Sequence, residues 1–137
     1  MVAYSFKQRF VQPIRVGLSR VQLSFDCPPK RQTIRAIGKR RHARPQEVVQ
    51  LYHAQRTQHC FKIGDGRCAS ARLIQIDLRP NDFGVRIDDG NWLRSRQLDE
   101  FAVADGFDDP ADMLAFWQAN HPDIALFDGA LIEWVPL

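Results

Sequence analysis

Alternating apolar and polar residues predict β-strands in the first two thirds of the chain. Residues 19–25 (SRVQLSF) place Val21, Leu23 and Phe25 on one side, as expected for a strand, whose side chains repeat with period two. Residues 47–54 (EVVQLYHA) are rich in β-branched and aromatic residues, which favour strands. Both segments are therefore predicted to be extended.

The N-terminal region is expected to contain little helix. Residues 3–11 suggest a short strand that runs into one helical turn, because Pro13 restricts any helix there. Residues 28–29 are two prolines, which stop regular structure and favour extended backbone before Lys30. Residues 32–37 can then continue as a strand.

Three glycine-containing stretches predict turns. Residues 64–66 (GDG) separate CFKI from the alternating run CASARLIQIDLR, which suggests a hairpin. Asp89-Gly90 is a strong two-residue hairpin signal. Asp128-Gly129 predicts a turn before a final strand, ALIEWV.

Helical spacing begins near residue 96 and continues in a second segment. Leu98, Phe101 and Ala102 lie at helical intervals and predict one buried face. The next helix should begin at Asp109, a favourable N-cap, with Pro110 in its first turn. Its predicted core-facing residues are Met113, Phe116 and Trp117, and Asn120-His121-Pro122 should end it.

These elements predict an α+β fold with five to seven short strands and a helical pair inserted before the last strand. Many short strands in a chain of 137 residues suggest one domain, spanning 1–137, built on a small mixed β-barrel. The chain has no G-x-G-x-x-G, no P-loop and no βαβ alternation, which argues against a dinucleotide-binding fold or a P-loop ATPase.

Charge is distributed unevenly along the chain. Fifteen of the nineteen Lys and Arg residues fall within positions 1–72, whereas thirteen of the sixteen acidic residues fall within 73–137. Such a split suggests an anionic ligand, which could be nucleic acid, a nucleotide phosphate or a smaller metabolite. Alternatively, the acidic segment partly neutralises the basic segment within the fold.

The basic residues are densest between positions 30 and 44, where seven Lys and Arg residues occur without an acid. This stretch contains the pattern Lys30-x-x-Thr33-x-Arg35. On a strand, Thr33 and Arg35 would share a face, and Lys30 in the preceding turn could fold over it. The three groups could then hold an anion or activate a hydroxyl, although many solvated surface strands carry the same pattern.

No apolar run approaches the ~20 residues of a membrane span, and MVAYSFKQRF lacks the apolar region of a secretory signal. Cys27, Cys60 and Cys68 are an odd number at irregular spacing, so a reduced, cytoplasmic protein is expected. Cys60 and Cys68 are better explained as buried strand residues than as metal ligands. The scattered carboxylates of Asp77, Asp82 and Asp88 do not suggest a metal site either.

Five short stretches, taken in order, resemble the ASCH domain family, especially its small phage- and prophage-associated members. They are KRQTIR (30–35), HARP (42–45), LYHAQRTQHC (51–60), ADGF (104–107) and FDGALIEW (127–134). ASCH domains belong to the PUA-like superfamily of small mixed β-barrels with flanking helices. The resemblance therefore implies a fold that agrees with the strand pattern.

The resemblance also implies a chemistry. One branch of ASCH-like proteins comprises amidohydrolases that deacetylate N4-acetylcytidine with a Lys and a Thr of K-x-x-T-x-R and an acidic residue. The matching positions are Lys30, Thr33 and Asp105, and Arg35 matches the family arginine. This chain departs from the pattern in two places: about ten extra residues separate Gly17 from Lys30, and Asp105 stands where that branch has Glu.

The leading hypothesis is a binding module whose basic cleft holds RNA or a modified nucleoside, with no metal or cofactor. Its ligand-binding residues would be Arg31, Arg35, His42 and Arg44. The alternative is the amidohydrolase with Lys30, Thr33 and Asp105 as catalytic residues. A nuclease and a purely structural phage accessory protein also remain open.

The aromatic residues divide into two groups. Tyr52 and Trp92 could stack on bases or could belong to the core. Trp117 and Trp134 are expected in the core.

Overall fold

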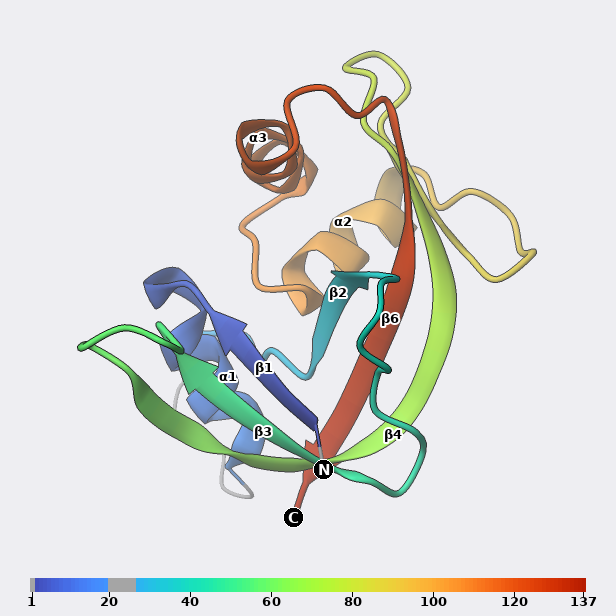
Figure 1. Ribbon diagram of the computed structural model, residues 1–137. Coiled ribbons are helices and arrows are strands. Elements are labelled where there is room, and N and C mark those ends of the chain that lie inside the picture. The colour runs from blue at the N-terminus through green and yellow to red at the C-terminus, as the bar shows by residue number, and fades with distance from the viewer. Residues whose placement is uncertain (1, 20–26) are drawn as a thin grey trace.

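The computed structural model describes residues 2–19 and 27–137. Within these residues the chain has a mixed α+β fold, with a six-stranded sheet and three α-helices (Figure 1). The elements are β1 (Val2–Phe6), a 3-10 turn η1 (Gln8–Phe10), α1 (Val11–Leu18), β2 (Gln32–Ala36), β3 (Val48–His53), β4 (Phe61–Asp77), β5 (Gly84–Ile87), α2 (Ser95–Ala104), α3 (Pro110–Asn120) and β6 (Leu126–Pro136). The α+β class and the helical pair before the last strand are confirmed.

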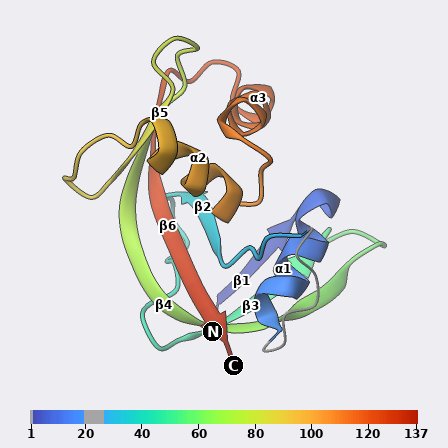
Figure 2. The same ribbon diagram turned by 180° about the vertical axis from the view of Figure 1, so that it is seen from behind.

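The sheet has the order β1-β3-β4-β6-β2, and β5 pairs with β4. β1 and β3 are parallel, and the other pairs are antiparallel. The long strands β4 and β6 curve through the molecule, with α1 near one end and α2 and α3 toward the other (Figures 1 and 2). The sheet is not closed, because β1 and β2 are its two ends and share no backbone ladder.

Side chains nevertheless connect the two ends of the sheet. The guanidinium of Arg35, on β2, donates a hydrogen bond to the carbonyl oxygen of Ser5, on β1, at 2.7 Å. The Tyr4 hydroxyl accepts a hydrogen bond from the backbone N–H of Ala43, in the segment that follows β2, at 3.1 Å. The edges of β1 and β2 are thus held near each other while the ladder between them stays open.

The hairpin predicted at residues 64–66 is wrong, because these residues lie inside the continuous strand β4. These glycines allow neighbouring side chains to pack closely against the strand. A Cβ at Gly64 would lie 2.6 Å from Leu18 Cδ1, and a Cβ at Gly66 would lie 2.9 Å from Trp134 Cδ1. Glycine within a strand often marks such an approach of neighbouring atoms.

The turn predicted at Asp128-Gly129 is also wrong, since both residues belong to β6. A Cβ at Gly129 would lie 2.6 Å from the carbonyl oxygen of Arg35 on the paired strand β2. At Asp89-Gly90 the chain does turn, and Gly90 N–H donates to the carbonyl oxygen of Ile87. The returning segment makes only the isolated bridge between Val85 and Leu93 within the described chain.

Helix formation near the N-terminus exceeds the prediction. α1 contains Pro13 in its first turn, where a missing N–H breaks no intrahelical hydrogen bond. The carbonyl oxygen of Pro13 accepts a hydrogen bond from the backbone N–H of Lys30 at 2.9 Å. α1 therefore positions the start of the β2 segment. The strand expected at 19–25 falls almost entirely on residues 20–26, which lie outside the described residues.

The helices before β6 follow their predicted patterns. Leu98, Phe101 and Ala102 of α2 are buried. Asp109 caps α3 by accepting a hydrogen bond from Asp112 N–H at 2.8 Å, and Pro110 lies in the first turn.

The residues predicted to lie in the core are buried, except for one residue of α3. Met113 and Trp117 are buried, as is Trp134 of β6, whereas Phe116 is only half-buried. Among the cysteines, Cys68 is buried in β4 as predicted, but Cys60 is exposed and Cys27 is partly exposed. The prediction of a buried strand residue is therefore wrong for Cys60.

Candidate functional site

A cavity of about 300 Å³ lies where β1, β2, α3 and the end of α2 come together. We call it the central cavity. Lys30, Thr33, Arg35 and Asp105 all line it. The fold thus gathers at one site four residues separated by up to 75 positions in the chain. Three of them belong to the K-x-x-T-x-R pattern, and the fourth, Asp105, was singled out by the ASCH resemblance.

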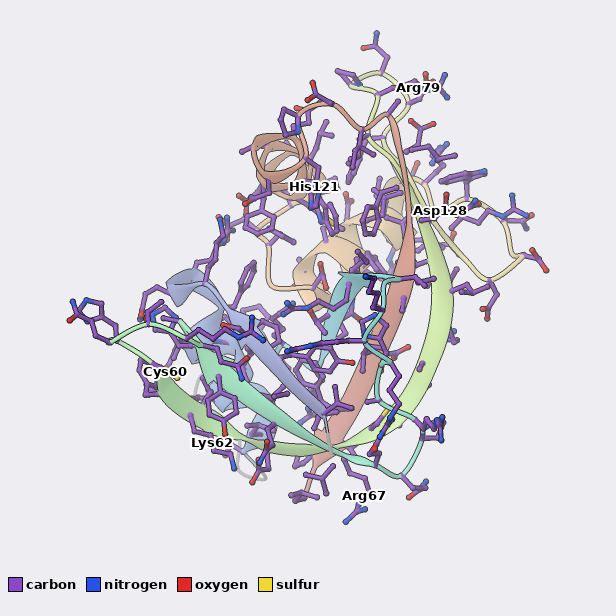
Figure 3. The ribbon with its side chains drawn as sticks, viewed as in Figure 1. Cys60, Lys62, Arg67, Arg79, His121 and Asp128 are labelled. Atoms are coloured by element: carbon purple, nitrogen blue, oxygen red, sulfur yellow. The ribbon has the colours of Figure 1, made fainter. Side chains whose placement is uncertain are left out.

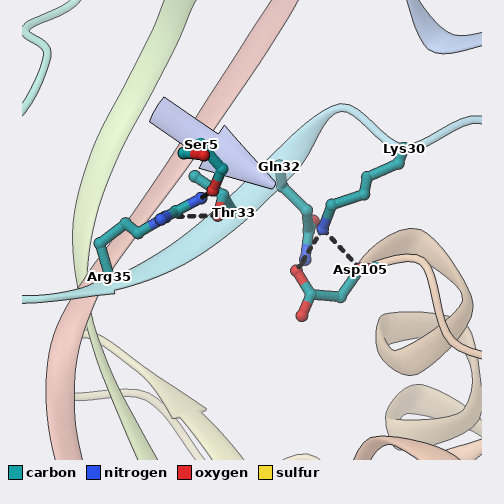
Figure 4. Close-up of polar contacts among 6 residues, drawn as sticks. All are labelled: Ser5, Lys30, Gln32, Thr33, Arg35 and Asp105. Carbon is teal, nitrogen blue, oxygen red and sulfur yellow. Dashed lines mark hydrogen bonds and ion pairs between the residues drawn. The ribbon is translucent and has the colours of Figure 1, made fainter. Parts of the chain in front are cut away.

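Lys30 and Asp105 form a buried pair. Lys30 Nζ donates to the backbone carbonyl of Asp105 at 2.5 Å and lies 3.3 Å from its carboxylate Oδ1 (Figure 4). The side-chain amide of Gln32 donates to the same Oδ1 at 3.3 Å. Lys30 and Asp105 are only 3% and 4% exposed, so the pair is almost completely removed from water.

Two glycines permit this placement of Lys30. A Cβ at Gly17 would lie 2.4 Å from the Lys30 carbonyl oxygen, so α1 packs directly against the backbone before β2. Gly106 has a φ of +98°, a conformation that favours glycine, and a Cβ there would lie 3.0 Å from Lys30 Cδ. The extra residues after Gly17 therefore do not separate Gly17 from Lys30 in space.

Thr33 and Arg35 form a second group beside the pair (Figure 4). Arg35 Nε donates to Thr33 Oγ1 at 3.0 Å, and Arg35 Nη2 donates to Ser5 O. A guanidinium has only donors, so the Thr33 oxygen accepts and its own proton remains available for another acceptor. Figure 4 draws no hydrogen bond between Lys30 and Thr33.

Burial shifts the pKa values of three charged groups in the cavity. Desolvation lowers the pKa of the Lys30 ammonium, and attraction to Asp105 opposes this shift. Desolvation likewise raises the pKa of the Asp105 carboxyl, opposed by Lys30 and by the hydrogen bond from Gln32. The pKa of Arg35 is lowered by desolvation. For Lys30 and Asp105, burial thus makes each charged form less favourable than in water, while the two charges stabilise each other.

Aromatic rings form much of the remaining wall. The rings that line the cavity are Phe6, Phe10, Phe107, Phe116, Trp117 and Phe127. Lys30 Nζ lies 4.8 Å from the ring centroid of Phe10, and the Arg35 guanidinium carbon lies 4.8 Å from that of Phe6. An apolar aromatic wall with a few polar groups is typical of small-molecule sites.

Three residues expected to bind ligand do not line the central cavity. Arg31 is turned toward α1, where its Nε donates to the Gly17 carbonyl oxygen at 2.7 Å. Arg44 is exposed beside Glu47 and is not part of the cavity wall. His42 stacks on Tyr4 with centroids 5.9 Å apart. Of the 30–44 segment, only Lys30 and residues 33–36 line the cavity, and Lys30 and Arg35 are the only basic residues among them.

Neither proposed stacking residue lies at the cavity. Tyr52 is half-buried on β3, and Trp92 is half-buried beside the Arg94 guanidinium, 5.6 Å from its ring centroid. Within residues 2–19 and 27–137, no group of three or more His, Cys, Asp or Glu side chains could hold a metal ion. No helix in the described part of the chain is long and apolar enough to span a membrane.

Several cavity residues were not singled out by the sequence. His121 and Asn120 were interpreted only as the end of a helix, yet both line the cavity. Figure 3 shows His121 beside α3, whereas Cys60, Lys62, Arg67 and Arg79 lie toward the periphery. The His121 ring stacks on Trp117, with centroids 4.9 Å apart. The sequence offered one indication of this role: His121 is a polar ring at the end of a helix that carries aromatic residues.

No protein-family model, no curated protein and no solved structure matches this chain.

Proposed function

We propose that the protein binds a single nucleoside, or a modified nucleoside, in the central cavity. The observation that carries this proposal is the wall of the cavity, in which aromatic rings surround the Lys30, Thr33, Arg35 and Asp105 side chains. Rings can stack on a base, and the polar groups can hydrogen-bond to its edge or to the sugar. The ASCH resemblance, with its PUA-like barrel, points to the same class of ligand.

The size of the cavity favours a nucleoside over a strand of RNA. Ligand pockets span roughly 300–1,000 Å³, and the central cavity, at about 300 Å³, lies at the small end. Binding of a strand would require a row of free cations along its backbone. Arg41 is instead paired with the Glu47 carboxylate, and Arg31 is turned toward α1, where its Nε donates to the Gly17 carbonyl oxygen.

A titration followed by amide NMR tests this proposal. Cytidine, N4-acetylcytidine and a short single-stranded RNA would be added separately to the protein at low salt. The expected result is that the nucleosides shift the amides of 30–36 and 105–107. The proposal is overturned if only RNA produces shifts, or if the nucleosides shift amides elsewhere.

The buried pair favours a second candidate function, the hydrolysis of an N-acylated nucleoside. Burial lowers the pKa of the Lys30 ammonium, which suits Lys30 to act as a general base, and raises the pKa of the Asp105 carboxyl, which suits Asp105 to act as a general acid. Lys30 would accept the proton of Thr33 or of a water, and the resulting oxygen nucleophile would attack the acyl carbonyl. Asp105 would protonate the departing amine, and cytidine would leave. If water is the nucleophile, acetate forms directly. If Thr33 is the nucleophile, its oxygen carries the acetyl group as an ester, which a water then hydrolyses to release acetate.

Turnover of N4-acetylcytidine in Thr33 variants tests the catalytic role. Thr33→Val preserves the shape of the side chain but removes the hydroxyl, and should reduce turnover by at least about a hundredfold, the scale of acid–base and nucleophilic contributions. Thr33→Ser retains the hydroxyl and should keep measurable turnover. Equal rates for Thr33→Val and the unchanged protein would exclude the assigned role, provided amide spectra show the same fold.

A further inference from the structure

A second cavity lies next to the central cavity and differs from it in charge. Its volume is about 450 Å³, and its wall includes Arg35, Arg40, Arg41 and His42 but no acidic residue. We call it the arginine cavity. Arg35 and Ala36 line both cavities. A ligand in the central cavity would therefore contact a residue that also borders the arginine cavity.

Not all of the basic residues in this wall are free to bind an anion. Arg41 makes two hydrogen bonds to the carboxylate of Glu47, which neutralises its charge. His42 Nε2 contacts the Ala36 carbonyl oxygen at 2.8 Å, so that nitrogen carries the proton. Its Nδ1 lies 3.1 Å from the Tyr4 hydroxyl, so both ring nitrogens of His42 are engaged within the fold.

Arg35 and Arg40 retain unused donors. Arg35 employs Nε and Nη2 toward Thr33 and Ser5, and a guanidinium has five N–H donors, so both hydrogens of Nη1 remain. Arg40 is exposed and makes no hydrogen bond or ion pair with any residue of the described chain. Two guanidinium groups with free donors and no facing carboxylate match the geometry of a phosphate.

We infer that the arginine cavity is a phosphate subsite, and that the ligand of the central cavity is a nucleoside monophosphate. This inference rests on the proposed function and adds the class of ligand. Arg35 would contact both the nucleoside and the phosphate of this ligand, because it hydrogen-bonds to Thr33 in the central cavity and also lines the arginine cavity. Arg40 would contact the phosphate alone.

Calorimetric titration with cytidine, its 5′- and 3′-monophosphates and inorganic phosphate tests the inference. One of the monophosphates should bind about tenfold more tightly than cytidine, the gain expected from one charge-assisted pair of hydrogen bonds. Arg40→Gln should remove this gain and leave the affinity for cytidine unchanged. Lys39→Gln is the matched control, because Lys39 is an exposed neighbour that does not line the cavity, and it should retain the gain.

The other outcomes are distinct. Equal affinity for cytidine and both monophosphates would overturn the phosphate subsite while leaving nucleoside binding intact. Absence of any binding by cytidine and both monophosphates, with or without binding of inorganic phosphate, would overturn the subsite together with the proposed function. A trinucleotide that binds far more tightly than either monophosphate would overturn the mononucleotide in favour of a strand.

Discussion

Burial of the Lys30 and Asp105 side chains carries a large unfavourable desolvation free energy. Removing two charges from water costs several kcal/mol per ion, and their attraction offsets this cost only with favourable geometry and further hydrogen bonds. Here Gln32 and the Asp105 carbonyl supply those hydrogen bonds. A pair of this kind is weak evidence for stability, and its place on the wall of a cavity supports a functional role.

Removing one partner of this pair should destabilise the protein. Lys30→Met leaves the Asp105 carboxyl buried without its cation, and should lower the free energy of unfolding by about 3–5 kcal/mol near neutral pH. Because the folded-state pKa of Asp105 is raised, its contribution to stability is present at low pH and is lost as the pH rises through that value. Urea denaturation at several pH values should therefore show a deficit that grows with pH.

The matched control removes both charges. Lys30→Met combined with Asp105→Leu should restore most of the stability or exceed that of the unchanged protein, by about 1–4 kcal/mol, while nucleoside binding is lost. A double variant no more stable than Lys30→Met would contradict this view of the pair.

At the scale of elements, the start of α3 is fixed by reciprocal hydrogen bonds. Asp109 accepts from the N–H of Asp112, and the Asp112 carboxylate accepts from the N–H of Asp108 at 3.0 Å. Arg9 also donates to Asp112, at 2.5 Å, and thereby joins η1 to α3. Since both elements contribute to the wall of the central cavity, this contact helps to set its width.

This contact predicts a pH-dependent stability. The hydrogen bond from Arg9 lowers the pKa of Asp112 below its ordinary value of 3.8, so the carboxylate stabilises the fold above that pH. The stabilisation is lost as the pH falls through the folded-state pKa. Asp112→Asn should lower the free energy of unfolding by about 1 kcal/mol at neutral pH, the scale of a carboxylate near a helix N-terminus.

Chemical denaturation of Asp112→Asn and of the unchanged protein at neutral and strongly acidic pH measures this effect. The two should converge in acid. Asp123→Asn, at an exposed position, should match the unchanged protein at neutral pH. A difference that persists in acid would show that Asp112 acts through something other than its charge.

At the scale of the whole molecule, local patterns predicted the strands better than the turns. The extended segments 32–37 and 47–54 and the two helices before β6 follow from periodicity and capping residues. Gly64, Gly66 and Gly129 were misinterpreted because their role depends on partners distant in the chain, such as Leu18 and Trp134. Glycine permits a turn, but it also permits close packing between segments, so the sequence alone does not distinguish the two roles.

The candidate site shows the same division between local and long-range information. Lys30, Thr33 and Arg35 were predicted as a group because strand geometry relates them locally, and Asp105 was added by family resemblance alone. The aromatic wall combines rings from β1, η1, α3, β6 and the segment between α2 and α3, so no local pattern reveals it or the place of His121 beside it. Arg31 and Arg44 share the basic segment but contact other parts of the fold.

The most direct test of the account is a crystal structure of Thr33→Val grown with N4-acetylcytidine. The variant retains the shape of the cavity and should turn the ligand over at least about a hundredfold more slowly. The account predicts a nucleoside with its base among the aromatic rings of the central cavity, within hydrogen-bonding distance of Lys30 or Arg35. A ligand bound on the outer face of the sheet, or an empty cavity at saturating nucleoside, would contradict it.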